Sequence, residues 1–365
     1  MDRLKLLDAG LRAFDSRLPD VAAPLCVVTR YRGSTCRLCL DACPADAVVT
    51  TPWLRVDPER CTSCGACAAR CKTGALSFVP RARRVRERLR EARQAGVRRV
   101  AFRCRVADGP VETEGAGEIS EASEAVPCLG ALAAGDLIAA AALGFSSVSL
   151  VDGGCPTCAD RAAGLGVDEV VASVAEILTT LAPTFAVRRV AASSPAAGPA
   201  AAPVAVGGAA MSRRDLFAHL AHGLRRTAAE AAVPAKPRVT SLHEQGPPPV
   251  ARAWLRSDLA ALARRAGDRD TVLPRALPFG HVSVSPPCDG CGLCLRYCPH
   301  GALGEVDAGA AVTGDARRAL PVVADDESCT GCGLCVESCP REALRLDPPA
   351  LSVLTQPREG STPPT

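Results

Sequence analysis

Twenty cysteines stand in this 365-residue chain, and most of them fall at short, fixed intervals. Three stretches read C-x2-C-x2-C-x3-C: Cys61, Cys64, Cys67 and Cys71, then Cys288, Cys291, Cys294 and Cys298, and then Cys329, Cys332, Cys335 and Cys339. A fourth stretch, Cys36, Cys39 and Cys43, matches the last three positions of the same pattern. This spacing places several thiols on one short loop, so each stretch is predicted to fold around a metal centre.

The spacing also indicates which kind of metal centre. Three thiolates two residues apart let one loop hold a corner of a cubane iron–sulfur cluster, and the fourth cysteine ligates the second cluster of a two-cluster unit. Gly65, Gly292 and Gly333 follow the second cysteine of their stretches, where the backbone must bend close to inorganic sulfide. Structural zinc usually takes two C-x2-C pairs that are far apart. The pattern therefore favours [4Fe–4S] clusters over zinc.

The sequence gives no sign of export or of membrane insertion. Residues 1–20 carry leucines at helical spacing, interrupted by Asp and Arg, so an amphipathic helix is predicted rather than a signal peptide. The longest apolar stretch, 128–151, contains Gly135 and Asp136, which predicts a helix followed by a strand rather than a membrane span. A cytoplasmic location without an integral membrane segment is expected, and its reducing environment favours metal ligation over disulfides.

Residues 26–80 and 285–347 resemble bacterial two-cluster ferredoxins. The segments "CTSCGACAARCKTGAL", "CDGCGLCLRYCPHGAL" and "CTGCGLCVESCPREAL" carry the resemblance. It implies an α+β ferredoxin-like dicluster module at each end of the chain, over 21–80 and 272–347, with short hairpins and small helices around the clusters. Three to four [4Fe–4S] clusters are therefore expected.

The resemblance also implies which cysteines share a cluster. The implied sets are Cys288, Cys291, Cys294 and Cys339; Cys329, Cys332, Cys335 and Cys298; and Cys61, Cys64, Cys67 and Cys43.

The fourth cluster departs from the pattern, because the position of its first ligand is Gly33. Cys36, Cys39 and Cys71 remain for it. Cys26 lies ten residues before Cys36, a stretch that reaches roughly 33 Å when extended, so it can loop back and replace the missing ligand. The alternatives are a [3Fe–4S] cluster, a non-cysteine ligand, or no cluster with Cys26 as a buried apolar residue.

Between the modules, residues 81–190 alternate between segments typical of strands and of helices. The strand-like segments end at Cys104 and Gly153. The predicted helices are 81–95, 130–143, one after Cys158, and 174–181, with "VDEVVAS" as a further segment between the last two. This alternation predicts a small central α/β domain with a parallel sheet. The sequence shows no dinucleotide fingerprint and no P-loop.

Four further cysteines, Cys104, Cys128, Cys155 and Cys158, fall at or near the ends of these strands. Ligands gather at the carboxyl edge of a parallel sheet, so these thiols are predicted to converge on one site. Cys104 and the segment "GGCPTC" resemble the delta iron–sulfur subunit that links methanogen hydrogenase to heterodisulfide reductase, which implies a [2Fe–2S] cluster. Because Cys104 stands alone where that family has a C-x2-C pair, zinc (Zn) and no metal remain as alternatives.

The stretch 191–271 is rich in Pro, Ala and Gly in two places, 191–210 and 233–250, and is predicted to form linkers that carry helices. One helix begins at Ser212 and carries His219 and His222, interpreted as surface residues, and another spans 251–266. Residues 348–365 are predicted to be a disordered tail.

Residues 81–95 carry seven arginines against two glutamates. Two interpretations stand: a solvated face partly neutralised by the acidic stretch 112–124, or a docking surface for an acidic redox partner. The net charge of +4 and the lack of aromatic residues among these arginines argue against nucleic acid as a partner.

Iron–sulfur clusters exchange single electrons with little rearrangement, so electron transfer between a donor and an acceptor oxidoreductase is the expected function. The chain would then be a subunit or partner of a larger oxidoreductase. One alternative is an oxidoreductase with chemistry at the middle-domain cluster, although no acid–base pair or nucleophile stands at a diagnostic spacing. Another alternative is a redox-enzyme maturation factor.

Overall fold

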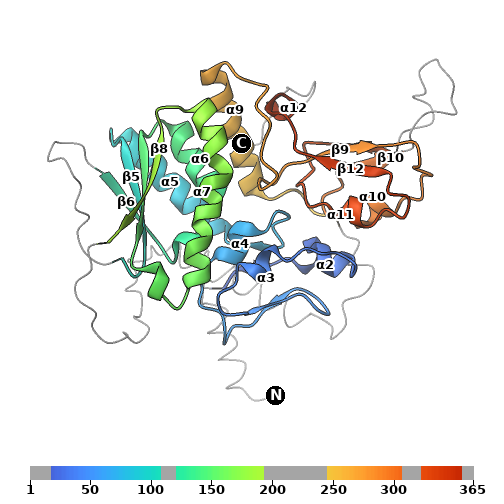
Figure 1. The fold of residues 1–365 in the computed structure, drawn as a ribbon, viewed down its shortest axis with the longest axis horizontal. Helices are drawn as coiled ribbons and strands as arrows, with labels where there is room; N and C mark the ends of the chain where they lie inside the picture. Colours follow the sequence, from blue (N-terminus) through green and yellow to red (C-terminus); the bar gives the residue numbers. More distant parts are fainter. Residues whose placement is uncertain (1–17, 108–120, 193–244, 306–321, 356–365) are drawn as a thin grey trace, which may run out of the picture.

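The computed structural model describes residues 18–107, 121–192, 245–305 and 322–355. Nearly all of the helix predicted over 1–20, the helix predicted from Ser212 with its two histidines, and most of the predicted linkers lie outside these residues. The described chain forms an N-terminal module, a middle α/β domain and a C-terminal module (Figure 1).

The N-terminal module consists of two pairs of very short antiparallel strands and several helices of one turn. β1 pairs with β4, and β2 pairs with β3. The elements are β1 (Asp20–Val21), η1, a 3-10 helix (Ala23–Leu25), α2 (Val27–Arg30), α3 (Leu38–Asp41), β2 (Val48–Val49), β3 (Arg55–Val56), α4 (Ala66–Arg70) and β4 (Leu76–Ser77).

The C-terminal module repeats this plan. β9 pairs with β12, and β10 pairs with β11, both antiparallel. The elements are β9 (His281–Val284), α10 (Leu293–Tyr297), β10 (Leu303–Glu305), β11 (Val322–Ala324), α11 (Leu334–Glu337) and β12 (Leu344–Asp347). Three of the one-turn helices begin directly after a glycine with positive φ: Gly65 (86°), Gly292 (73°) and Gly333 (79°). A close bend of the backbone was expected at these three glycines, and positive φ is a conformation that glycine adopts at little cost.

The middle domain contains a four-stranded parallel sheet in the order β6-β5-β7-β8, which confirms the predicted parallel sheet. Its strands are β5 (Arg99–Cys104), β6 (Glu121–Val126), β7 (Ser147–Asp152) and β8 (Ala186–Ala191). The two strands expected from the sequence, β5 and β7, lie at the centre of the sheet. β6 and β8 are edge strands whose side chains, apart from that of Val126, are half-exposed or exposed, so their sequences lack the apolar pattern that identifies a buried strand.

Helices α5, α6 and α7 lie beside this sheet (Figure 1). Their bounds are α5 (Val79–Gln94), α6 (Ala134–Leu143) and α7 (Arg161–Leu181), and two 3-10 helices, η2 (Leu129–Ala131) and η3 (Cys155–Thr157), precede α6 and α7. The segment "VDEVVAS", expected to separate two helices, instead lies inside α7. Val167, Val170 and Val174 are all buried, and their spacing of three and four residues is that of one helix face.

Helix α9 (Val250–Ala266) joins the C-terminal module to the middle domain. It packs against α6, and α12 (Leu351–Thr355) packs against α9. α9 agrees with the helix predicted over 251–266, but Leu255 and Leu259 make it part of the middle domain's apolar core rather than of a linker. Residues 348–355 were expected to begin a disordered tail. They contain α12 instead, because Leu351 and Leu354 enter the same core.

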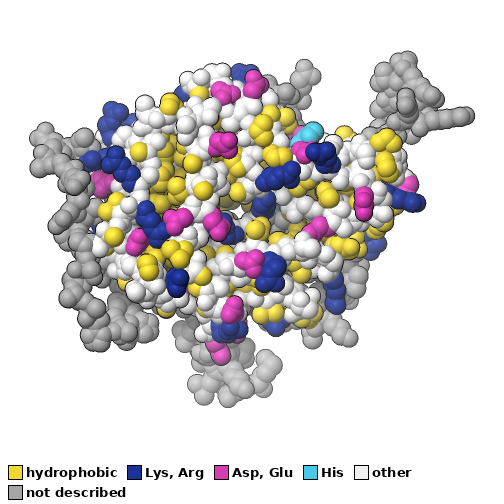
Figure 2. All heavy atoms as spheres, viewed as in Figure 1, with side chains coloured by type: hydrophobic (Ala, Val, Ile, Leu, Met, Phe, Trp, Pro, Cys, Tyr) yellow, Lys and Arg dark blue, Asp and Glu magenta, His cyan; other side chains and the backbone are white. Residues whose placement is uncertain are grey.

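The arginines of α5 have different surroundings. Arg86 pairs with Asp258 of α9 at 2.5 Å, with both side chains nearly buried, and Arg88 pairs with Glu124 of β6 at 3.0 Å. Figure 2 shows basic and acidic side chains interspersed with apolar ones on the face drawn. No helix formed by the described residues is long and apolar enough to cross a membrane.

Candidate metal centres

Four cysteines of the C-terminal module, Cys288, Cys291, Cys294 and Cys339, line one small cavity and are named the outer C-terminal set. The first three come from the segment that runs into α10, and Cys339 follows α11. The Cys291 side chain is exposed, whereas Cys294 is buried. The fold thus brings together the four cysteines that the ferredoxin resemblance implies for one cluster, with one thiol at the surface.

The other four cysteines of this module are Cys298, Cys329, Cys332 and Cys335, named the inner C-terminal set. Cys335 lies within electrostatic range of the other three thiols, that is, close enough for a charge on one of them to raise its pKa. Cys332 lies within the same range of Cys298 and Cys329. Cys294 of the outer set is also within range of Cys335, so the two sets are neighbours.

In the N-terminal module, Cys43, Cys61, Cys64 and Cys67 line a second small cavity and are named the outer N-terminal set. Cys67 lies within electrostatic range of the other three thiols. Phe78, which precedes α5, closes one wall of this cavity. This grouping is also the one that the resemblance implies.

The inner N-terminal set consists of Cys26, Cys36, Cys39 and Cys71. Cys39 lies within electrostatic range of the other three, and Cys26 is buried in the same apolar cluster as Cys39 and Cys71. A Cβ at position 33 would stand 2.7 Å from the Tyr31 ring, so that ring would have to move for a side chain there. The fold brings Cys26 to the other three thiols of this set.

Backbone N–H groups surround several of these thiols. The cysteine that precedes proline in three of the stretches accepts the N–H of the residue four positions later: Ala47 to Cys43 and Ala302 to Cys298, each at 3.2 Å, and Ala343 to Cys339 at 3.4 Å. Such donors to sulfur stabilise negative charge at the site and raise the potential of a bound cluster.

Burial acts in the opposite direction on two other thiols of these sets, because it disfavours the charged thiolate. It raises the pKa of Cys39 to about 12 and the pKa of Cys294 to about 11, and neighbouring cysteines contribute to both shifts. Iron binds cysteine as the thiolate, so a bound cluster would supply the positive charge that offsets this cost. The all-sulfur donor sets fit [4Fe–4S] clusters.

All twenty cysteines are free thiols in this structure. Within the described residues, no three His, Cys, Asp or Glu side chains are placed to share a single metal ion. A cubane cluster is several atoms wide, so its ligands need not converge as tightly as the ligands of one ion do.

Three of the four middle-domain cysteines stand at the carboxyl ends of strands of the parallel sheet. Cys104 ends β5, Cys128 follows β6 and Cys155 follows β7. Cys155 lies within electrostatic range of Cys104, and Cys128 lies within range of Cys155. Cys158 follows η3 and accepts the Asp160 N–H at 3.4 Å. These four residues are named the middle set.

The middle set adjoins the N-terminal module. Cys64 of the outer N-terminal set and Cys128 pack in one small apolar cluster, and they lie within electrostatic range of each other. Arg105, one residue after β5, donates to the Thr62 carbonyl at 3.2 Å and to the Asp160 carboxylate at 2.7 Å. These contacts hold the cysteine loop of the module against the edge of the sheet.

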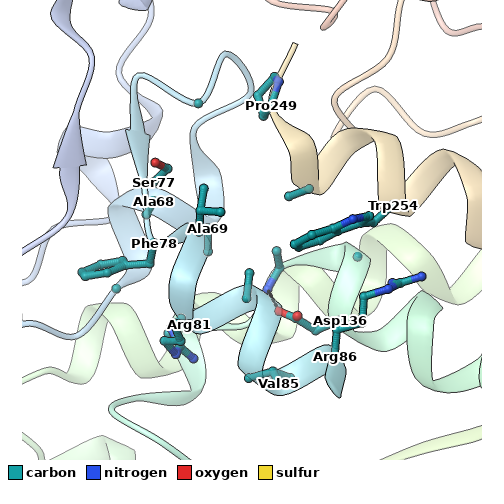
Figure 3. Close-up of a pocket in the computed structure, with 18 of the residues that line it drawn as sticks. Ala68, Ala69, Ser77, Phe78, Arg81, Val85, Arg86, Asp136, Pro249 and Trp254 are labelled. Carbon is teal, nitrogen blue, oxygen red and sulfur yellow. Dashed lines mark hydrogen bonds between the residues drawn. The ribbon is translucent and has the colours of Figure 1, made fainter. Parts of the chain in front are cut away.

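A larger cavity of about 150 Å³ lies between α4, α5, α6 and α9 (Figure 3). Most of its lining is apolar, with Trp254 at one side. Two of its charged residues serve the packing of the surrounding helices. Asp136 accepts the Ala133 N–H at the start of α6 (2.8 Å), and Arg86 holds Asp258 of α9.

Comparison with known families agrees with this geometry. Residues 287–343 match a model of the 4Fe-4S dicluster domain, and residues 54–77 match a model of the 4Fe-4S binding domain. A search of curated proteins and a search of solved structures each found no match. The chain therefore carries iron–sulfur cluster-binding domains near both ends, which is consistent with electron transfer.

Sequence reasoning missed the cations beside these sets. Arg252 of α9, 4% exposed, donates to the Cys329 carbonyl at 2.8 Å, and Lys72 lies between the two modules. Lys72 follows Cys71 directly and is one of three lysines in an arginine-rich chain, which is a weak signal. Nothing in the sequence around Arg252 indicates its contact, because its partner lies 77 residues away.

Proposed function

We propose that the chain is a multi-cluster electron carrier, in which each of the four terminal sets holds one [4Fe–4S] cluster. The observation that carries this proposal is the grouping of sixteen cysteines into four sets of four, two sets in each module, within or beside the segments that match iron–sulfur domains. Cys26 is proposed as the fourth ligand of the inner N-terminal set.

The residues of the chain have three tasks in this function. The thiolates bind iron, the N–H groups of Ala47, Ala302 and Ala343 stabilise charge on sulfur, and the apolar side chains around each set exclude water. A bound cluster supplies one-electron chemistry, and burial and hydrogen bonds set its potential.

The partners are proposed to be a donor and an acceptor oxidoreductase in the cytoplasm. The outer C-terminal set is the natural place for exchange with one of them, because Cys291 is exposed. Beside it, Asp289 and Arg341 form a surface ion pair at 2.8 Å, which gives a partner polar groups of both signs to recognise.

The middle set is proposed to hold a fifth centre, a [2Fe–2S] cluster. This is supported by the convergence of Cys104, Cys128 and Cys155 at one edge of the sheet. Cys128→Ser in the full-length protein should remove about two irons per chain and leave the cubane signals in place. Loss of bound zinc instead, or unchanged metal content, would contradict a [2Fe–2S] cluster at this site.

Metal analysis and redox titration test the main proposal. The protein, reconstituted with iron and sulfide without oxygen, should hold about sixteen irons in its four cubane sites and show reducible EPR signals. About fourteen irons or fewer per chain, which three cubane clusters and the middle centre would account for, or no reducible signal, would rule out the four-cluster assignment.

Cys26→Ser tests the unusual ligand. It should convert one cubane cluster to a [3Fe–4S] signal or abolish it, and Arg32→Gln, an exposed change in the same segment, should leave all signals unchanged. Retention of four intact cubane clusters in Cys26→Ser would show that another group completes the inner N-terminal set.

A further inference from the structure

The two terminal modules contact each other through their cysteine-bearing segments. The ring centroids of Tyr31, just after α2, and Tyr297, at the end of α10, are 5.3 Å apart. Thr35 donates to the Glu337 carboxylate of α11 from its backbone N–H at 3.1 Å and from its hydroxyl at 2.5 Å. Both pairs lie within a few residues of candidate ligands, so the contact brings two cysteine sets from different modules toward each other.

Lys72 lies in this contact. Its ammonium donates to the Arg275 carbonyl at 2.5 Å and to the Gly331 carbonyl at 3.3 Å, and Gly331 belongs to the loop of the inner C-terminal set. The same ammonium lies within electrostatic range of Cys36 in its own module and of Cys332 in the other. One cation thus faces thiols of both inner sets.

Arg30 adds a second cation on the same side of the N-terminal module. It donates to the Arg296 carbonyl at 3.3 Å and lies within electrostatic range of Cys298 and Cys332. Lys72 and Arg30 therefore both lie within electrostatic range of thiols of the inner C-terminal set.

Within each module, the inner set also lies close to the outer set. Cys294 of the outer C-terminal set is within electrostatic range of Cys335 of the inner one. In the N-terminal module, Cys39 of the inner set is within range of Cys67 of the outer set, and Cys64 of that outer set adjoins Cys128 of the middle set. With Lys72 between the inner sets, each set has the next one as its neighbour.

We propose that the two inner sets form a coupled pair bridged by Lys72, which joins the two modules into one electron path. The path runs from the outer C-terminal set through the inner C-terminal, inner N-terminal and outer N-terminal sets to the middle set. This inference rests on the proposed function, since it requires clusters in the four terminal sets. Each step moves one electron, which oxidises the donor site and reduces the acceptor site by one, without bond or proton transfer. External redox proteins supply and remove the electrons.

Lys72 has a defined effect in this arrangement. Reduction of either inner site adds one negative charge near its ammonium, so the cation stabilises both reduced states and raises both potentials. Lys72→Met removes the charge and keeps the apolar stem, whereas Lys72→Arg keeps the charge. Arg345→Met removes an exposed charge from β12 of the C-terminal module and serves as the control.

Redox titration of the full-length protein by EPR tests the bridge. The inner signals are identified as those lost in Cys39→Ser and in Cys335→Ser. In Lys72→Met, with iron content equal to that of the parent, both inner signals should shift to lower potential by about 59 mV. That shift corresponds to a tenfold change in the ratio of reduced to oxidised site. In Lys72→Arg, which keeps the charge, both potentials should stay close to the parent values. In Arg345→Met both potentials should change little. A shift of only one inner signal, or of neither, would overturn the bridge.

A second measurement does not depend on the Lys72 variants. Loss of the inner N-terminal site in Cys39→Ser should slow the spin relaxation of the inner C-terminal signal, because a nearby paramagnet is removed. Unchanged relaxation with the inner C-terminal signal present would show that the modules are not coupled, and the proposed function would still stand. Absence of cluster signals in the parent would instead contradict the proposed function itself.

Discussion

Arg252 is the contact by which α9 holds the cysteine loop of the C-terminal module, and Arg252→Met is expected to release that loop. The guanidinium donates to the carbonyls of Pro278 (2.8 Å), Asp326 (3.0 Å), Cys329 (2.8 Å) and Glu327, and it lies 4.7 Å from the centre of the Phe279 ring. Burial lowers the pKa of Arg252 to about 10, so the side chain still carries its charge at neutral pH.

The expected loss follows from these contacts. A buried carbonyl left without its donor costs about 1 to 3 kcal/mol. If water reaches two of the four carbonyls, the remaining two contribute about 3 kcal/mol, and loss of the cation–π contact adds about 1 kcal/mol. The sum of about 4 kcal/mol corresponds to nearly a thousandfold in the equilibrium for opening of the loop.

Hydrogen exchange of the full-length, cluster-loaded protein measures this opening. Amides of the loop 325–331 should lose about a hundredfold or more in protection in Arg252→Met. Arg256→Met is the matched control on the same helix, because its partner Glu327 and Arg256 itself are about one third exposed, and such pairs contribute about 0 to 1 kcal/mol. Equal loss of protection in the two variants would refute the role assigned to the buried carbonyl contacts.

Three further outcomes are expected. Arg86→Met should destabilise the middle domain by about 3 to 5 kcal/mol in urea titrations, because it leaves buried Asp258 unpaired; Arg86→Met with Asp258→Leu should recover most of the loss, and no recovery would exclude this cause. Burial raises the pKa of Asp136 above 3.8, so the free energy of unfolding falls as pH rises and this buried carboxyl ionises. Asp136→Asn keeps an acceptor for the Ala133 N–H and should unfold at higher urea than the parent at pH 8, with a smaller gap at pH 5; lower stability at pH 8 would contradict this. Removal of iron by a chelator should expose both terminal modules to limited proteolysis and spare the middle domain, because cysteines form much of the modules' cores; equal cleavage of all three parts would count against it.

The cysteine sets could largely be predicted from the sequence, because the spacing that defines them is local. Three or four thiols on one short loop limit how that loop can fold, whatever surrounds it. The central strands β5 and β7 could be predicted for a similar reason, since buried strands are locally rich in apolar residues. The edge strands β6 and β8 could not be predicted, because most of their side chains are half-exposed or exposed and their sequences mix polar and apolar residues.

The spacing of the cysteines thus determined, without the structure, that the chain carries iron–sulfur modules at both ends. Tertiary structure alone decided which distant groups stand beside them. It brought Cys26 to the other three thiols of the inner N-terminal set, made α9 and α12 part of the core, and set Lys72 between the two modules. These relations join residues far apart in the chain, and packing and charge, rather than local spacing, determine which of them meet.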